Sequence, residues 1–178
     1  MNIFSMLKKF AVTLFCVFVV IYMPAFALSI SLSSSIIDFG SMNPGDFKEI
    51  PIAGFYNRVS VISDQNNVWF LKISVTSPLT NTALPSVTIP NSSFNWMSTY
   101  AGSQNAPFNN LSAGLNHQPS GGYINFSLVD ELVYTAINGS DYLNTPNGTE
   151  VQFKYAIGLP SSQTAGDYTT TVVYTVTQ

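Results

Sequence analysis

Cysteine and histidine are almost absent from this sequence of 178 residues. Cys16 is its single cysteine, and His117 is its single histidine. A zinc site needs several cysteine or histidine ligands. A Ser-His-Asp catalytic set needs a histidine that is held in orientation as the base, and no residue around His117 suggests such an arrangement. Asp130 and Glu131 are adjacent, so on a strand they point to opposite faces and cannot act as a carboxylate pair. We therefore expect no catalytic residues, no metal site and no cofactor, and a protein that is not an enzyme.

Charge is also scarce, at 8% of the residues, with six Lys plus Arg and nine Asp plus Glu. No basic stripe is present that would bind nucleic acid or hold the chain electrostatically on a membrane surface. Ser, Thr, Asn and Gly supply the polarity instead. Such a composition favours strands with Thr on their wet faces and Asn or Gly in turns, and it disfavours long helices.

Residues 1–27 have the pattern of a signal peptide. Lys8 and Lys9 precede an apolar run over 10–22 that is shorter than the roughly 20 residues of a membrane span. Pro24 ends the run, and Ala25-Phe26-Ala27 has the small-x-small form of a cleavage site. The alternative is an uncleaved N-terminal anchor. We expect contact with a membrane only before cleavage, and a secreted, cell-surface or periplasmic location afterwards.

The chain that remains, residues 28–178, has no cysteine and a formal charge of about −5, because Lys8 and Lys9 leave with the signal peptide. Export without disulfides fits a bacterial envelope or extracellular protein. About 150 residues suffice for one domain with its own core. We expect a single β-sandwich domain over 28–178.

Period-two alternation dominates the C-terminal tail. Val151, Phe153, Tyr155 and Ile157 share one parity, and a second run over 167–177 repeats the pattern. The tail is therefore expected to be two antiparallel strands, each with one wet face. The residues expected to be mostly buried and to meet across two sheets are Trp69, Leu71, Ile73, Val151, Phe153, Tyr155, Ile157, Tyr168, Val172, Tyr174 and Val176.

The alternation and the turn residues together predict an all-β fold, a two-sheet antiparallel sandwich of immunoglobulin-like type with about eight to ten strands. Residues 57–63 and 68–76, separated by a polar loop, are expected to pair as a hairpin. The other expected strands are 28–32, 36–40, 47–53, 87–89, 94–97, 123–128 and 132–136. Tyr168, after Gly166, fits either a tyrosine corner, in which the hydroxyl bonds an upstream backbone group, or an ordinary core aromatic.

The middle of the chain, residues 77–122, is predicted to be a loop-rich insertion, since it holds five prolines and many Asn, Ser and Gly residues. Trp96 and Tyr100 are its candidate ligand-binding residues, because flat aromatic faces stack on sugar rings or peptides. Four residues apart, they share a face on a helix or on a strand. The alternative is that Trp96 closes one end of the sandwich.

Short motifs resemble two families of bacterial surface proteins. Trp69-x-Leu71 resembles the first Trp-x-Leu motif of WxL surface domains, although Tyr174-x-Val176 stands where those domains have the second. Ile37-Asp38-Phe39-Gly40 and Gly166-Asp167-Tyr168-Thr169 are similar to spore-coat-U-like and Csu-type pilus subunits, which usually carry cysteines.

Both resemblances imply an exported, non-catalytic, immunoglobulin-like sandwich at the cell surface. The expected function is a structural or adhesion module, and the alternative is a polysaccharide- or cell-wall-binding module that uses exposed aromatics. The expected partners are envelope or extracellular proteins, polysaccharides or other copies of the chain.

Overall fold

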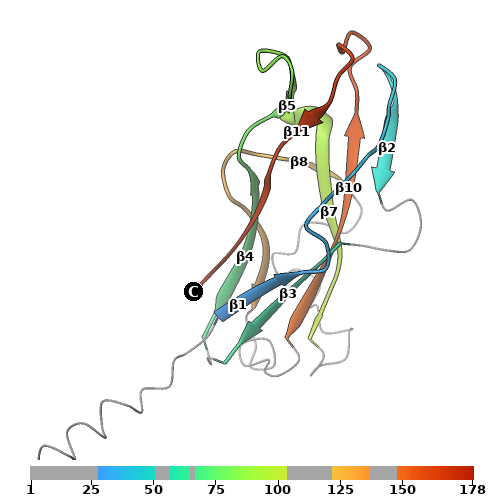
Figure 1. The fold of residues 1–178 in the computed structure, drawn as a ribbon. Helices are drawn as coiled ribbons and strands as arrows, with labels where there is room; N and C mark the ends of the chain where they lie inside the picture. Colours follow the sequence, from blue (N-terminus) through green and yellow to red (C-terminus); the bar gives the residue numbers. More distant parts are fainter. Residues whose placement is uncertain (1–27, 51–56, 65–66, 104–121, 137–147) are drawn as a thin grey trace, which may run out of the picture.

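The computed structural model describes residues 28–50, 57–64, 67–103, 122–136 and 148–178. Their regular secondary structure is almost entirely antiparallel β-strand (Figure 1). The predicted signal peptide, His117 and the second half of the middle segment lie outside these residues. One 3-10 turn, η1 (Asn91–Ser93), interrupts the strands. The all-β prediction is confirmed. Within the described ranges, no helix has the length and apolar character that crossing a membrane requires.

The larger sheet has six strands in the order β1-β3-β10-β7-β8, with β2 also paired to β10. Its strands are β1 (Leu28–Leu32), β2 (Phe47–Ile50), β3 (Asn57–Ser63), β7 (Phe94–Ser103), β8 (Ile124–Asn125) and β10 (Thr149–Gly158). The ten residues of β10 pair with β3 and β2 on one side and with β7 on the other. β10 is therefore the central strand of this sheet.

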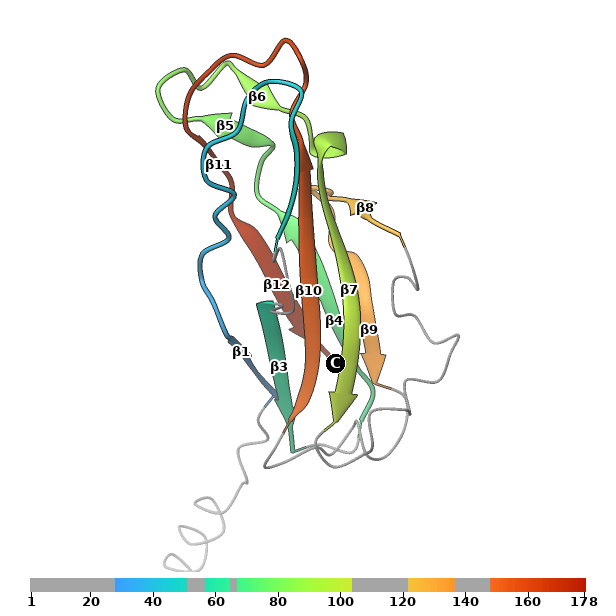
Figure 2. The ribbon, with the colours of Figure 1, turned by 90° about the vertical axis from the view of Figure 1, so that its right-hand side faces the viewer.

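Two three-stranded sheets, in the orders β12-β4-β9 and β11-β5-β6, complete the fold. Their strands are β4 (Trp69–Val75), β5 (Leu79–Asn81), β6 (Thr88–Ile89), β9 (Glu131–Ala136), β11 (Tyr168–Thr169) and β12 (Val172–Thr177). Figure 2 shows β12, β4 and β9 behind β3, β10 and β7, so the strands form two layers in a sandwich-like arrangement.

The core lies between the two layers. Among the predicted core residues, those with no exposed surface come from one strand of each layer: they are Trp69, Leu71 and Ile73 of β4 and Val151 and Phe153 of β10. Tyr155 and Ile157 are also buried, so the predicted parity of both strands is correct. The four remaining predicted core residues are only partly buried, because they lie on β11 and β12 at the edge of the fold: Tyr168, Val172, Tyr174 and Val176.

The predicted hairpin between 57–63 and 68–76 is wrong. β3 pairs with β1 and β10 in the larger sheet, whereas β4 pairs with β12 and β9 in the opposite layer. The two tail strands, β10 and β12, likewise lie in different layers. Alternation predicts which side chains face the core, but it does not predict which strand is the hydrogen-bonding partner. A short polar loop can therefore connect two strands in different layers as well as the two strands of a hairpin.

The middle segment is not an insertion over its described residues. It contributes β5, β6 and β7, and the ten-residue strand β7 pairs with the central strand β10 in the interior of the larger sheet. The sequence predicts a strand only over 94–97, because residues 98–103 are mostly small or polar and carry little strand preference. Conversely, the strand predicted over 36–40 pairs with no other strand in the described structure.

Candidate functional site: a groove along one edge of the sandwich

A groove of about 940 Å³ runs between residues 34–44, which we name the edge segment, and residues 163–172 of the C-terminal run. Its apolar lining comes from both layers: Leu79, Ile89, Phe94, Ile157 and Leu159. Its polar lining is formed mainly by hydroxyl and amide side chains, together with the carboxylates of Asp38 and Asp167. Such a surface, apolar within and uncharged at most of its rim, suits contact with a polypeptide more than binding of a small anion.

The edge segment is held to the core by alternate side chains. Ile37, Phe39 and Met42 are partly buried against the core cluster, while Asp38 and Gly40 between them are exposed. The ring of Phe39 meets that of Phe94 edge to face, with centroids 6.0 Å apart, and Phe94 stacks on Phe126 at 4.2 Å. The period-two pattern of 36–40 thus positions side chains correctly, although no strand forms there.

The backbone of the edge segment is bonded by side chains rather than by a strand ladder. The amide of Ser34 donates to Asn57 Oδ1 at 3.3 Å, and the amide of Gly40 donates to Asp38 Oδ1 at 2.7 Å. Lys48 Nζ donates to the carbonyl of Phe39. Among the described residues, none of the backbone-to-backbone hydrogen bonds outside the ladders involves 34–42. The edge segment therefore leaves the neighbouring C-terminal run without a paired strand on this side.

The opposite wall is fixed by a tyrosine corner. Tyr168 Oη donates to the carbonyl of Thr164 at 2.7 Å, four residues upstream, and it accepts from Gln163 Nε2 at 2.6 Å. This bond confirms the tyrosine-corner interpretation of the sequence. Gly166 has φ +153°, and a Cβ there would lie 2.1 Å from Asn81 Nδ2. Only glycine fits so close to a buried amide, so the sequence Gly166-Asp167-Tyr168 fixes this wall locally.

A buried hydroxyl pair joins the two layers at the base of the groove. Tyr155 of β10 and Tyr174 of β12 are hydrogen-bonded through their hydroxyls, and Asn57 Nδ2 donates to Tyr155 Oη at 3.1 Å. Burial raises the pKa of Tyr155 to about 12, although its bonds to Tyr174 and Asn57 favour ionisation. Burial and the neighbouring Tyr155 raise the pKa of Tyr174 well above 10. Both hydroxyls are therefore neutral donors at physiological pH.

The protein is expected to lose stability in alkali because of this pair. An unfolded tyrosine ionises near pH 10, whereas folded Tyr155 ionises near pH 12, so the folded state holds its proton through this window. The free energy of unfolding should therefore fall by about 1–3 kcal/mol between pH 10 and pH 12. Urea unfolding at both pH values measures the fall, and a Tyr155→Phe, Tyr174→Phe variant should show less of it. An equal fall in that variant would show that other groups cause it.

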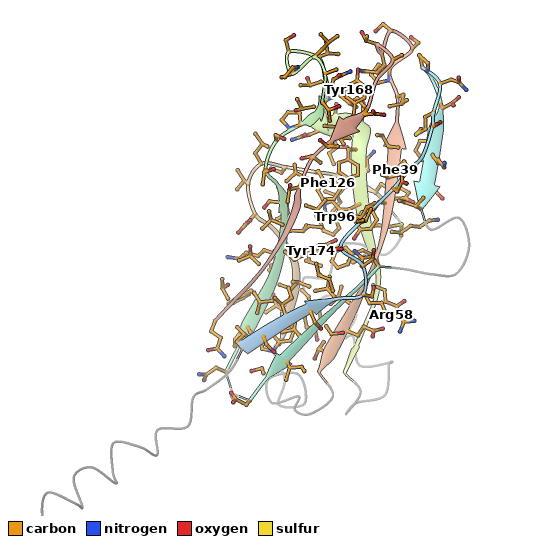
Figure 3. All side chains as sticks on the ribbon, viewed as in Figure 1. Phe39, Arg58, Trp96, Phe126, Tyr168 and Tyr174 are labelled. Carbon is orange, nitrogen blue, oxygen red and sulfur yellow. The ribbon has the colours of Figure 1, made fainter. Side chains whose placement is uncertain are left out.

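Two ion pairs lie on the larger sheet, outside the groove. Lys154 Nζ of β10 lies 2.7 Å from Glu49 Oε2 of β2, and this hydrogen bond is the main reason that the pKa of Glu49 lies below its ordinary value. Arg58 Nε lies 3.7 Å from Glu150 Oε1. Figure 3 shows Arg58 pointing away from the core, while Trp96, Phe126 and Tyr174 lie between the layers. These exposed pairs contribute little to stability.

Of the two predicted ligand-binding residues, the structure places only the side chain of Trp96. Trp96 has no exposed surface and its ring lies 6.0 Å from that of Phe153, so it is a core residue and offers no face to a sugar. The backbone of Tyr100 pairs with Gln152, and its side chain lies outside the described part of the structure. The register shifts between these two positions, where Gln152 pairs with Tyr100 but Phe153 pairs with Ser98.

The residues that form the groove were missed because no local pattern marks them. The apolar side chains of 36–42 resemble those of an ordinary strand, and the sequence does not indicate that their backbone lacks a partner. Tyr155 and Tyr174 have the correct inward parity, but their contact joins strands of different layers. In the described ranges, no three His, Cys, Asp or Glu side chains gather in a way that could hold a metal ion.

Comparison of the chain with protein-family models, with curated proteins and with solved structures finds no significant match.

Proposed function

We propose that this protein is a non-catalytic module exported by a bacterium, with an immunoglobulin-like sandwich that serves a structural or adhesive role at the cell surface or outside the cell. The N-terminal pattern of residues 1–27 supports export. The motifs around Trp69 and Gly166, which resemble those of surface domains and pilus subunits, support the role. The layered antiparallel sheets are the kind of rigid scaffold that such modules use.

The observation that carries the proposal is the incomplete cover of one sandwich edge. Ile30 and Leu32 of β1 pair with the buried Val61 and Val59 and so share their inward parity, yet they are 39% and 44% exposed. Ile36, at the start of the groove, is 74% exposed. Apolar side chains gathered on one edge of a sandwich mark a protein contact. The partner that fits is another copy of the chain, joined edge to edge.

Expression of the full-length chain in a bacterial host tests the export part of the proposal. The protein should leave the cytoplasm, and its N-terminal sequence should begin at Leu28. An Ala25→Asp, Ala27→Asp variant should stay unprocessed, because the cleavage site requires small residues, while a Ser29→Asp variant should be processed normally. A wild-type chain that keeps its first residues and remains in the cytoplasm would contradict the proposal.

A pull-down on peptidoglycan and common glycans separates this role from polysaccharide binding. With Trp96 in the core, the exported protein should not be retained on either material. Size-exclusion chromatography on the same sample should show multimers. A monomer that is retained on glycan would favour a polysaccharide-binding module instead.

A further inference from the structure

Within the described parts of the chain, the C-terminal strand β12 has a strand partner on one side only. It pairs with β4 from Val172 to Thr177 in an unbroken register, and it is the end strand of its sheet. β1 lies near β12 but belongs to the other layer and is not hydrogen-bonded to it. All six residues of β12 are half-buried. Among the described residues, one edge of β12 therefore has no hydrogen-bonded strand, and its first residues border the groove.

The hydrogen-bond pattern between β12 and β4 shows which residues of β12 direct their backbone groups to the free edge. Val75 donates its amide to Ser127, on the β9 side of β4, whereas Thr76 donates to Thr171. Opposite residues of an antiparallel pair alternate between bonded and non-bonded positions, so the odd-numbered residues of β12 bond β4. The even-numbered residues, Val172, Tyr174 and Val176, direct their N–H and C=O groups to the free edge. Among the described residues, these N–H and C=O groups form no backbone hydrogen bond outside the strand ladders.

This edge lacks the features that protect other edges. β2 carries Lys48 and Glu49, and β9 begins at Glu131, whereas residues 168–178 contain no charge and no proline. Val and Thr dominate β12, and both favour strands. Charges, prolines and bulges are the usual means by which end strands avoid pairing with other molecules. An uncharged, regular and β-branched end strand is therefore suited to pairing.

We propose that β12 pairs with β12 of a second copy of this chain, antiparallel and around a two-fold axis at Tyr174. The proposal rests on the structural role given above and names the surface involved. Tyr174 would exchange both backbone bonds with Tyr174 of the second copy, and Val172 with Val176 of the second copy. On the outer face, Val173 would lie opposite Thr175 of the second copy.

The two-fold pairing fits the sequence of β12 because each residue that faces the core meets another residue that faces the core. A register centred on an even-numbered residue keeps inward residues opposite inward residues, so apolar Val172 meets apolar Val176. No like charges oppose each other across the pair, although the chain is acidic overall. The same patch is used by both copies, so the contact closes as a dimer rather than growing into a filament.

Two double variants of the full-length exported protein test the pairing and its register. Val173→Glu, Thr175→Glu would place carboxylates opposite each other across the dimer, in positions where side chains are closest. Val173→Lys, Thr175→Glu would place Lys opposite Glu instead. Both variants share the change at Thr175, which lies beside Lys72 of β4, so they differ only in the sign of charge at position 173.

We expect analytical ultracentrifugation to show a wild-type dimer, a dimer Kd at least about tenfold weaker for the Glu-Glu variant, and a dimer again for the Lys-Glu variant. Thermal melts of both variants check that the monomer remains folded. A wild-type chain that is monomeric at about 100 µM, or a Glu-Glu variant that dimerises as tightly as wild type, would overturn the proposal.

An oxidised Val173→Cys, Thr175→Cys variant gives an independent measurement. Positions 173 and 175 of the two copies would lie about 4.5 Å apart in Cα distance, within reach of a disulfide. A covalent dimer should form with the double variant and not with Val173→Cys alone, and equal cross-linking of both would refute the register. An exported protein whose multimers persist unchanged in the Glu-Glu variant would disprove the pairing alone, whereas a dimer retained in the cytoplasm would disprove the exported role alone.

Discussion

Replacement of Phe153 by Ala is expected to lower the free energy of unfolding by about 3–5 kcal/mol. Phe153 has no exposed surface, and it is where the two layers meet. Its ring lies 5.2 Å from that of Tyr174 in the opposite layer and 6.0 Å from that of Trp96 in its own. Truncation would leave a cavity among large rings of different strands, which cannot collapse together to fill it.

Urea unfolding followed by circular dichroism measures the loss. Phe47→Ala is the matched control, since Phe47 lies on the same sheet but is 62% exposed, and its loss should be within about 0.5 kcal/mol of zero. If both variants lost the same small amount, Phe153 would not be a core residue.

Replacement of Trp96 by Ala should cost a similar amount, about 3–5 kcal/mol, or a fall in melting temperature of about 2–4 °C for each kcal/mol in a chain of this size. The indole of Trp96 is fully buried on β7, opposite Tyr155 on β10. A binding residue on the surface would behave differently, because its removal would weaken ligand retention and leave the melting temperature unchanged.

Trp96→Phe separates packing from hydrogen bonding at this position. Trp96 Nε1 has no partner within the described residues, so a phenyl ring loses volume but no bond there. We expect a loss of about 1–2 kcal/mol, well below that of Trp96→Ala. If Trp96→Ala bound glycans less well at an unchanged melting temperature, the ring would be a contact residue after all.

The sequence predicts the all-β fold and the faces of its strands well, because both follow from local alternation. Val151, Phe153 and Tyr155 face the core as their parity requires. The corner at Tyr168 is also predictable, since its bond to Thr164 spans only four residues. Each of these features depends on residues that are close together in the chain.

The features that the sequence does not predict depend on residues far apart in the chain. β3 and β4 look like a hairpin until their partners, β10 and β12, are known. The small residues after Ser98 give no signal of a long interior strand. The groove exists because the edge segment and the C-terminal run lie side by side without pairing. No residue in either segment predicts that backbone hydrogen bonds between them are missing.

The central place of β10 has a consequence for the order in which the chain can fold. β10 joins β2, β3 and β7, yet it follows all three of them in the chain. Until it emerges, these earlier strands lack the neighbour that assembles the larger sheet, and loop closure over such separations is slow. The nascent chain must therefore keep these β-prone segments apart until β10 is available, and this interval is when it is most exposed to aggregation and to chaperone binding.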